Sequence, residues 1–258
     1  NIKKVVTDAG RRYTTYGASR DSDLTAEDIN LTSFGSSFTV SGKGRKLGKV
    51  VLRVPGMHNV YNALAAVSLG LHLEISFGNI AAALERFGGV QRRFQLMGSC
   101  DGITLIDDYA HHPTEVRVTL EAARVGDWNR IIGVFQPHRY SRTKYLHREF
   151  AHAFDNADVI VLTDIYGAGE EPVPGVTGKL LVDAVLQGNS HKQVVYLPKK
   201  SDIRYFLLTS AKPGYLILTM GAGDIWTAGE EFLETLRQKV GTLSRIRGEV
   251  DAFSQSGM

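Results

Sequence analysis

Residues 107–115 read DDYAHHPTE and place two carboxylates and two imidazoles within six residues, followed by a proline. Side chains of these types can bind a metal ion, pair a nucleophile with its base, or hold a polar ligand at the rim of a pocket. His111 and His112 are adjacent, so on a helix they would point about 100° apart and could share one ion only in a turn. Alternatively, one histidine caps a helix and the other is solvated. The stretch by itself leaves these possibilities open.

A second candidate is HRYSRT at residues 138–143, where Arg139 and Arg142 stand three residues apart as a helix begins. Two guanidinium groups beside a helix N-terminus can bind a carboxylate or a phosphate. A solvated basic surface is the alternative.

A third candidate is GMHNVYN at residues 56–62. Asn59 and Asn62 share a helix face, and paired amides can read the edge of a purine by hydrogen bonds, as they read adenine in DNA. Helix capping is the simpler interpretation of both asparagines.

The elements that must position these residues follow a regular pattern in the second half of the chain. Strand-like runs alternate with helix-like runs, which predicts an α/β fold with a mainly parallel sheet and helices on both faces. We expect a hairpin around Asp101-Gly102, strands at 103–107, 130–135, 158–164, 193–197 and 215–220, and helices from Pro113 and at 142–154, 177–186, 201–210 and 224–240.

Four polar stretches each follow one of these strands: DDYAHHPTE, QPHRYSRT, DIYGAGEEPVPG and GAGD. In an open parallel sheet, ligands bind beyond the carboxyl ends of the strands, where helix N-termini present free N–H groups. We therefore expect these stretches to meet on one rim. Gly221 and Gly223 of GAGD would permit a tight turn or a close approach of the backbone.

The first half of the chain has a different pattern. Residues 1–55, including the opening run NIKKVV, predict extended segments joined by turns. Apolar residues at helical spacing then predict a helix over 58–73, and a second helix is expected from Ser76 as N-cap to Gly88-Gly89. This change of pattern predicts three parts: residues 1–91, residues 92–243, and a flexible tail at 244–258.

Composition excludes several classes of protein. The 258 residues are 43% hydrophobic and 22% charged, typical of a globular protein. No apolar run reaches the ~18 residues of a membrane span, and there is no signal-peptide pattern. Cys100 is the only cysteine, which excludes a disulfide framework and favours a reducing cytoplasm. The net charge of +3 is too small to indicate nucleic-acid binding.

Six ordered motifs together resemble the Mur ligases, ATP-dependent enzymes that form amide bonds in bacterial cell-wall synthesis. The motifs are GMHNVYNALAA, QRRF, DDYAHHPTE, QPHRYSRT, AGEEP and MGAGDI. The resemblance runs from about Val54 to Trp226 and is greatest to the branch that adds L-alanine to UDP-N-acetylmuramate. It implies that residues 1–91 are the β-rich and helical end of a central ATP-binding domain. Residues 92–243 would then form a Rossmann-like C-terminal domain.

The resemblance also implies a mechanism and roles for individual residues. ATP would phosphorylate the sugar-acid carboxylate, and the alanine amine would attack the acyl phosphate, with Mg²⁺ neutralising the phosphates. Expected to bind ATP are His58, Asn59, Asn62, Arg93 and Asp108. Expected to line the site for alanine and the acyl phosphate are His111, His138, Arg139, Arg142 and Glu170, with His111, Arg139 and Arg142 as the catalytic candidates. DDYAHHPTE would then be a rim and not a metal cage.

One departure from the family pattern concerns activity. The P-loop G-x-x-x-x-G-K-[ST], whose backbone cradles phosphates, is absent from the sequence. We therefore expect a C-terminal fragment that folds at least from Arg93 onward but does not form the amide alone, with the Mg²⁺ ligands mainly upstream. The expected partners are UDP-N-acetylmuramate, L-alanine and ATP, without nucleic acid or membrane, and the oligomeric state stays open.

Three alternatives accompany this interpretation. The nearest is the murein-recycling ligase of the same family, which attaches a tripeptide to the same sugar acid. A more remote one is a metal-dependent phosphohydrolase with ligands from Asp107, Asp108, His111, His112 and Asp164. The third is a nucleic-acid module built on the basic stretches RR, HRYSRTK and GKGRK.

Overall fold

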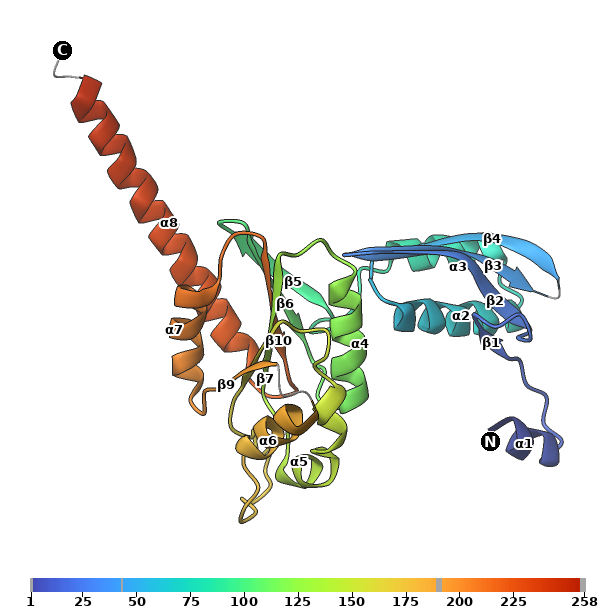
Figure 1. Cartoon of the computed structure of the whole chain (residues 1–258). Helices are drawn as coiled ribbons and strands as arrows, with labels where there is room; N and C mark the ends of the chain where they lie inside the picture. Colours follow the sequence, from blue (N-terminus) through green and yellow to red (C-terminus); the bar gives the residue numbers. More distant parts are fainter. Residues whose placement is uncertain (1, 43, 189–191, 256–258) are drawn as a thin grey trace. The chain divides into compact units, whose positions relative to one another are not determined.

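The computed structural model describes residues 2–42, 44–188 and 192–255 (Figure 1). The chain divides into two compact units, Asn1–Gly89 and Val90–Met258, and each is described by itself. Across the described ranges, no helix is both long enough and apolar enough to cross a membrane.

The first unit is a four-stranded sheet with two helices packed on one face. The strands are β1 (Tyr16–Gly17), β2 (Leu24–Thr32), β3 (Gly35–Gly42) and β4 (Arg45–Leu52), in the order β1-β2-β3-β4. The helices are α2 (Met57–His72) and α3 (Phe77–Arg86). Phe38 and Val40 alternate with more exposed residues on β3 and pack with Val50, Val60 and Leu64, because successive strand residues point to opposite faces.

Both predicted helices of this unit are confirmed. α2 buries Val60, Leu64 and Val67, three of the positions at helical spacing. Ser76 is the N-cap of α3, where its hydroxyl oxygen accepts a hydrogen bond from the backbone N–H of Asn79 at 3.4 Å.

The extended run predicted at the start of the chain is wrong. Residues Ile2–Asp8 form helix α1. A strand needs a neighbour to complete its hydrogen bonds, and β1 to β4 make a sheet without this segment. A helix satisfies its N–H and C=O groups within its own turns.

The second unit is built on a six-stranded sheet in the order β5-β6-β10-β7-β8-β9. Its strands are β5 (Gln95–Cys100), β6 (Ile103–Asp108), β7 (Arg130–Phe135), β8 (Val159–Leu162), β9 (Gln193–Tyr196) and β10 (Tyr215–Met220). β5 pairs antiparallel with β6, and the other neighbours are parallel. The last strand, β10, therefore lies between β6 and β7.

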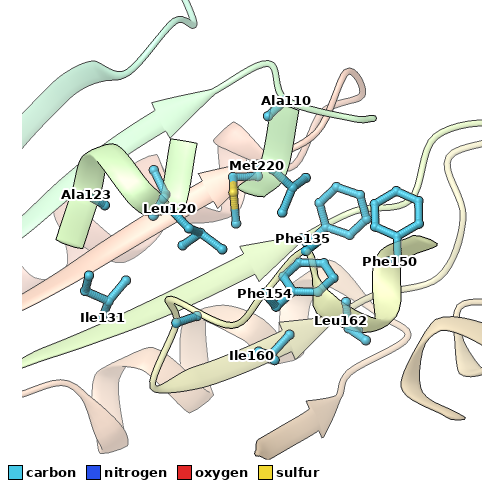
Figure 2. Packing of buried hydrophobic residues seen from close by; sticks show 14 of the residues in the cluster. Ala110, Leu120, Ala123, Ile131, Phe135, Phe150, Phe154, Ile160, Leu162 and Met220 are labelled. Atoms are coloured by element: carbon cyan, nitrogen blue, oxygen red, sulfur yellow. The ribbon is translucent and has the colours of Figure 1, made fainter. Parts of the chain in front are cut away.

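Helices cover both faces of this sheet, as predicted (Figure 1). One face carries α4 (Pro113–Arg124), α5 (Tyr140–Leu146), the 3₁₀ turn η1 (Glu149–His152) and α6 (Lys179–Gly188); the other carries α7 (Lys200–Ser210) and α8 (Trp226–Gln255). Successive residues of each strand point alternately into two hydrophobic cores, one on each face of the sheet. Figure 2 shows the first core, in which Leu120, Ile131, Phe135 and Met220 pack together. Ile132, Ile217 and Phe232 belong to the second core.

The predicted strands of this unit are confirmed, as is the hairpin. Asp101 and Gly102 both have positive φ, 51° and 71°, the backbone of a two-residue type I′ turn. α4 begins at Pro113 as expected.

Two helix predictions need correction. The helix expected at 142–154 is divided into α5 and η1, and the break lets Phe150 and Phe154 both pack on Phe135, with ring centroids 5.2 and 5.4 Å away. The final helix, expected to end near Val240 before a tail at 244–258, continues to Gln255. A helix supplies its own backbone hydrogen bonds, so it can extend past the residues whose apolar spacing predicts it.

Candidate functional site

The polar stretches that follow β6, β10, β7 and β8 lie at one edge of the sheet, because these are neighbouring parallel strands. The loops are also joined directly. Arg139 N–H donates to Tyr166 C=O at 2.9 Å, and Tyr166 N–H donates to Pro137 C=O at 2.8 Å. The expected convergence on one rim is therefore present in the structure.

Four side chains of this edge, His111, His138, Arg139 and Arg142, form what we name the cationic rim. The rings of His111 and His138 have centroids 5.7 Å apart. Arg142 Nη1 lies 2.9 Å from His138 Nδ1 and 3.2 Å from the His138 carbonyl oxygen. The His138 ring also stacks on Tyr166, with centroids 5.8 Å apart and planes 11° apart.

The electrostatics of the rim keep His138 neutral. Burial, followed by the charge of Arg142, lowers the pKa of His138 to about 4. A guanidinium can only donate, so Nδ1 is the acceptor and the proton of the neutral ring lies on Nε2. His138 is therefore a neutral hydrogen-bond donor beside two permanent cations.

Arg139 and Arg142 have no carboxylate within ion-pair distance among the residues that the structure describes. Arg139 is exposed, with φ 71°, immediately before α5, and Arg142 is half-buried in its first turn. Glu170 approaches the same helix start, but its carboxylate accepts from Ser141 N at 2.9 Å and Ser141 Oγ at 2.5 Å. These hydrogen bonds hold the pKa of Glu170 below its usual value.

The two histidines of DDYAHHPTE have different surroundings. His112 is the N-cap of α4, with Nδ1 accepting from Thr114 N at 3.3 Å, and Glu115 closes the capping box. His111 is half-buried instead of solvated, with Nδ1 2.9 Å from the Tyr109 carbonyl oxygen. One histidine thus caps the helix and the other lies on the rim.

The two aspartates of the motif are buried, and Arg92 binds one of them. Asp107 is 0% exposed and accepts from Arg92 Nε at 2.9 Å and Thr219 Oγ1 at 2.7 Å. The same guanidinium donates to the carbonyl oxygens of Gly223, at 2.9 Å, and Gly221, at 2.6 Å. We name this arrangement the Arg92 clamp. It ties the start of β5 to the ends of β6 and β10.

Asp108 was expected to be the carboxylate that reaches a nucleotide. Its side chain is 5% exposed and accepts from the backbone N–H groups of Phe94, at 2.8 Å, and Ala110, at 2.7 Å. Burial raises the pKa of Asp108 to about 6. Both carboxylates of the motif therefore accept hydrogen bonds from protein donors.

Sequence reasoning missed Arg92 and the group around Asp224. Gln136 Nε2 donates to Asp224 Oδ1 at 2.9 Å, and Lys200 Nζ donates to Asp224 Oδ2 at 2.5 Å. Arg92 and Gln136 stand inside motifs already singled out, QRRF and QPHRYSRT, whereas Lys200 has no sequence signal.

The geometry does not gather the five residues of the phosphohydrolase hypothesis. Asp107 and Asp108 are engaged as described, Asp164 accepts from Tyr196 Oη at 2.6 Å, and His112 caps α4. Among residues 2–42, 44–188 and 192–255, no three His, Cys, Asp or Glu side chains are grouped as a metal site requires.

The basic stretches of the nucleic-acid hypothesis have different partners. Arg92 belongs to the clamp, and Arg142 to the rim. Lys46 lies in the other unit, where its Nζ is 3.7 Å from Asp28 Oδ2. Lys43 lies outside the described residues.

The amide pair of the first unit has the predicted shared face. Asn62 Nδ2 donates to Asn59 Oδ1 at 3.3 Å, while Asn59 Nδ2 donates to Pro55 C=O at 2.7 Å and lies 3.2 Å from His58 Nε2. Neither amide caps α2, whose N-cap is Gly56. In the second unit, Arg93 is half exposed, with Nη1 3.8 Å from Glu115 Oε1.

Both units match family models of known proteins. Residues 1–70 match the family model described as Mur ligase middle domain, and residues 92–223 match Mur ligase, glutamate ligase domain. A relative from Salinibacter ruber named UDP-N-acetylmuramate–L-alanine ligase is 47% identical over 243 residues, which are 94% of this chain and 51% of the relative.

Solved structures of Mur ligases also resemble this chain. A UDP-N-acetylmuramate-alanine ligase from Thermotoga maritima has a TM-score of 0.74 at 30% identity, covering 88% of this chain and 48% of that one. A murein peptide ligase from Psychrobacter arcticus has a TM-score of 0.61 at 27% identity, covering 92% and 49%. The chain spans about half the length of the curated relatives it matches. It belongs to the Mur ligase family.

Proposed function

We propose that the chain is part of an ATP-dependent ligase that joins L-alanine to the carboxylate of UDP-N-acetylmuramate in peptidoglycan precursor synthesis. The observation that carries the proposal is the cationic rim, where Arg139 and Arg142 lie at strand ends without a carboxylate partner among the described residues. The relative from Salinibacter ruber carries the name of this activity at 47% identity, which supports the same assignment.

In the proposed reaction, the sugar-acid carboxylate takes the γ-phosphoryl group of ATP and ADP leaves. The neutral amine of alanine then attacks the acyl carbon, and the tetrahedral intermediate loses phosphate and the amine proton to leave the amide. Arg139 and Arg142 bind the alanine carboxylate by charge-assisted hydrogen bonds, and His138 adds a neutral N–H donor. His111 lines the same rim. The rate gain comes from positioning and electrostatics, since these groups remain in place throughout the reaction.

The nucleotide is assigned to the residues named in the motifs. Asn59 and Asn62, with His58, would hold adenine by their amide edges. Arg93 is half exposed, has long contacts with Glu115 and the Tyr109 ring, and would meet the phosphates. Asp108 would need to leave Phe94 and Ala110 to reach a nucleotide, so it is the least supported of these assignments. Mg²⁺ neutralises phosphate charge when bound, but the described residues group no three suitable ligands, and we assign none of them to it.

The domain and partner assignments follow from the same proposal. Residues 1–91 would be the C-terminal part of the ATP-binding domain, and residues 92–243 the amino-acid-binding domain. The partners are small molecules and not nucleic acid or membrane. We place the reaction in the bacterial cytoplasm, in agreement with the single free cysteine, Cys100.

The test is a coupled ADP-release assay on the protein expressed from the complete gene. ADP release should require both UDP-N-acetylmuramate and L-alanine. Arg142→Ala should raise the KM for alanine about 10- to 100-fold, because a hydrogen bond to a charged group is worth ~1.5–3 kcal/mol. The KM for the sugar nucleotide should stay unchanged. Arg117→Ala, on the exposed side of α4, is the matched control.

The second candidate is the murein-recycling ligase, supported by the Psychrobacter arcticus structure at 27% identity. The same assay separates the two, because that activity would use a tripeptide in place of alanine. ADP release with a tripeptide and none with alanine would overturn the first proposal.

A further inference from the structure

Gln136 is a buried polar side chain at the rim that the proposed reaction has not used. It follows the last residue of β7, is 6% exposed, and reaches the loop after β10, where Nε2 donates to Asp224 Oδ1 at 2.9 Å. Lys200 holds the other oxygen of Asp224. The amide therefore has one end anchored on an ion pair.

The anchor decides which way the amide points. A carboxylate can only accept, so the NH₂ group of Gln136 must face Asp224 and the oxygen Oε1 must face away. In this orientation, Oε1 is a buried side-chain acceptor with no hydrogen-bond partner within the described part of the chain. Leaving a buried acceptor unmatched is unfavourable, so such an atom calls for an explanation.

Four carboxylates near this edge already accept hydrogen bonds from protein donors. Asp107 accepts from Arg92 and Thr219, Asp108 from two backbone N–H groups, and Glu170 from Ser141. Asp224 accepts from Gln136 and Lys200. Among these polar groups, Gln136 Oε1 is the acceptor that the protein leaves without a donor.

The surroundings of Oε1 connect it to the cationic rim. A methyl group built on Gly223 would collide with Gln136 Oε1 and would lie 2.7 Å from Cγ of Tyr166, so the three groups border one small space. Tyr166 is 40% exposed and stacks on His138. The Tyr166 ring therefore connects the space beside Oε1 to the cationic rim.

We propose that Gln136 Oε1 accepts a hydrogen bond from the α-amino group of the amino acid whose carboxylate is bound by Arg139 and Arg142. An amino acid needs donors for its carboxylate and an acceptor for its ammonium group. The rim supplies donors in Arg139, Arg142 and His138, and Gln136 supplies the acceptor. A hydrogen bond there also orients the amine for attack. This inference rests on the proposed function, because it assumes an amino-acid substrate at the rim.

The test compares L-alanine with propionate, which has the same carboxylate and methyl group but no amine. Both are titrated into the full 258-residue chain by NMR, with the wild type, Gln136→Met and Gln193→Met. Gln193 lies at the exposed start of β9, so it is the same substitution away from the rim. Wild type and Gln193→Met should bind alanine at least 10-fold more tightly than propionate. Gln136→Met should lose most of this preference while keeping its affinity for propionate.

The remaining outcomes separate two failures. If the wild-type chain binds alanine and propionate equally, or if Gln136→Met weakens both ligands to the same degree, Gln136 does not receive the amine and the inference is overturned. If neither ligand binds to the wild type, the amino-acid site itself is refuted, and the proposed function fails with it.

Discussion

The Arg92 clamp and the cationic rim lie at the same edge of one sheet but balance their charges differently. In the clamp, the guanidinium of Arg92 meets a carboxylate and two carbonyl oxygens, and Asp107 is fully buried beneath it. In the rim, the guanidiniums of Arg139 and Arg142 gather beside two imidazoles, and neither guanidinium has a carboxylate at ion-pair distance within the described residues.

This difference separates holding a loop from binding a ligand. A buried charge with all its partners is costly to disturb, so the clamp can fix the Gly221–Asp224 loop in one conformation. An unbalanced cluster is available to an anion, since the ligand supplies the charge that the protein leaves out. The clamp thus provides the rigid support on which the rim depends.

The largest expected effect is the loss of the clamp. Arg92→Ala leaves the buried carboxylate of Asp107 without its cation, which should lower the free energy of unfolding by ~3–5 kcal/mol. Urea unfolding at pH 7 measures it. Arg142→Ala on the rim should cost less than about 0.5 kcal/mol, because it leaves no buried charge behind. If Arg142→Ala lowered the free energy of unfolding as much as Arg92→Ala, the rim would be a structural cluster like the clamp.

The second largest expected effect is a loss of stability with rising pH, caused by Asp108. The raised pKa of Asp108, about 6, means that the folded state favours the protonated form. Its contribution to stability is therefore complete below about pH 4 and is lost as the pH rises through about 6. Relative to Asp108→Asn, the wild type should lose up to about 3 kcal/mol between pH 4 and 7. Unfolding by urea at four pH values tests this; parallel curves for the two proteins would contradict it.

Lys200 should give an intermediate result. Its pair with Asp224 is partly solvent-exposed, with side chains 34% and 45% exposed. Such a pair is worth ~0.5–1 kcal/mol, so Lys200→Met should lower the melting temperature by a few degrees at most. If Lys200→Met destabilised the protein as much as Arg92→Ala, the Lys200–Asp224 pair would have to be counted as part of the Arg92 clamp.

The smallest effect on stability, and the most informative about the rim, is the titration of His138. Burial is the main cause of its low pKa, about 4, and the charge of Arg142 is the second. Arg142→Ala should therefore raise the pKa of His138 without restoring it fully to 6.5. Histidine ring protons followed by NMR between pH 3 and 8 measure it, with Arg117→Ala as control. An unchanged pKa would mean that the charge of Arg142 does not lower the pKa of His138.

The sequence predicted those features that depend on neighbouring residues. Ser76 caps α3 and Pro113 opens α4 because both signals act within one helical turn. The Asp101-Gly102 turn follows from the tolerance of these residues for positive φ. Local signals failed where packing decides, as in the division of the helix expected at 142–154.

The candidate site could be predicted only in part for the same reason. His138, Arg139 and Arg142 lie together in the sequence, so their clustering at the start of α5 is a local matter. Arg92 binds carbonyl oxygens 129 and 131 residues away, and no spacing in the sequence indicates this contact. Gln136 became a candidate only when the structure showed that its oxygen lacks a partner.

By itself, the sequence determined the alternation of strands and helices and the polar stretches after the strands. It thereby determined that a rim would exist. Only the tertiary structure decided that β10 enters between β6 and β7, which brings Gly221 and Gly223 to Arg92 and Asp224 to Gln136. The physical reason is that strands buried on both faces are apolar throughout. Their side chains therefore do not indicate which strand lies beside which. That choice is made by backbone hydrogen bonds and core packing between distant segments.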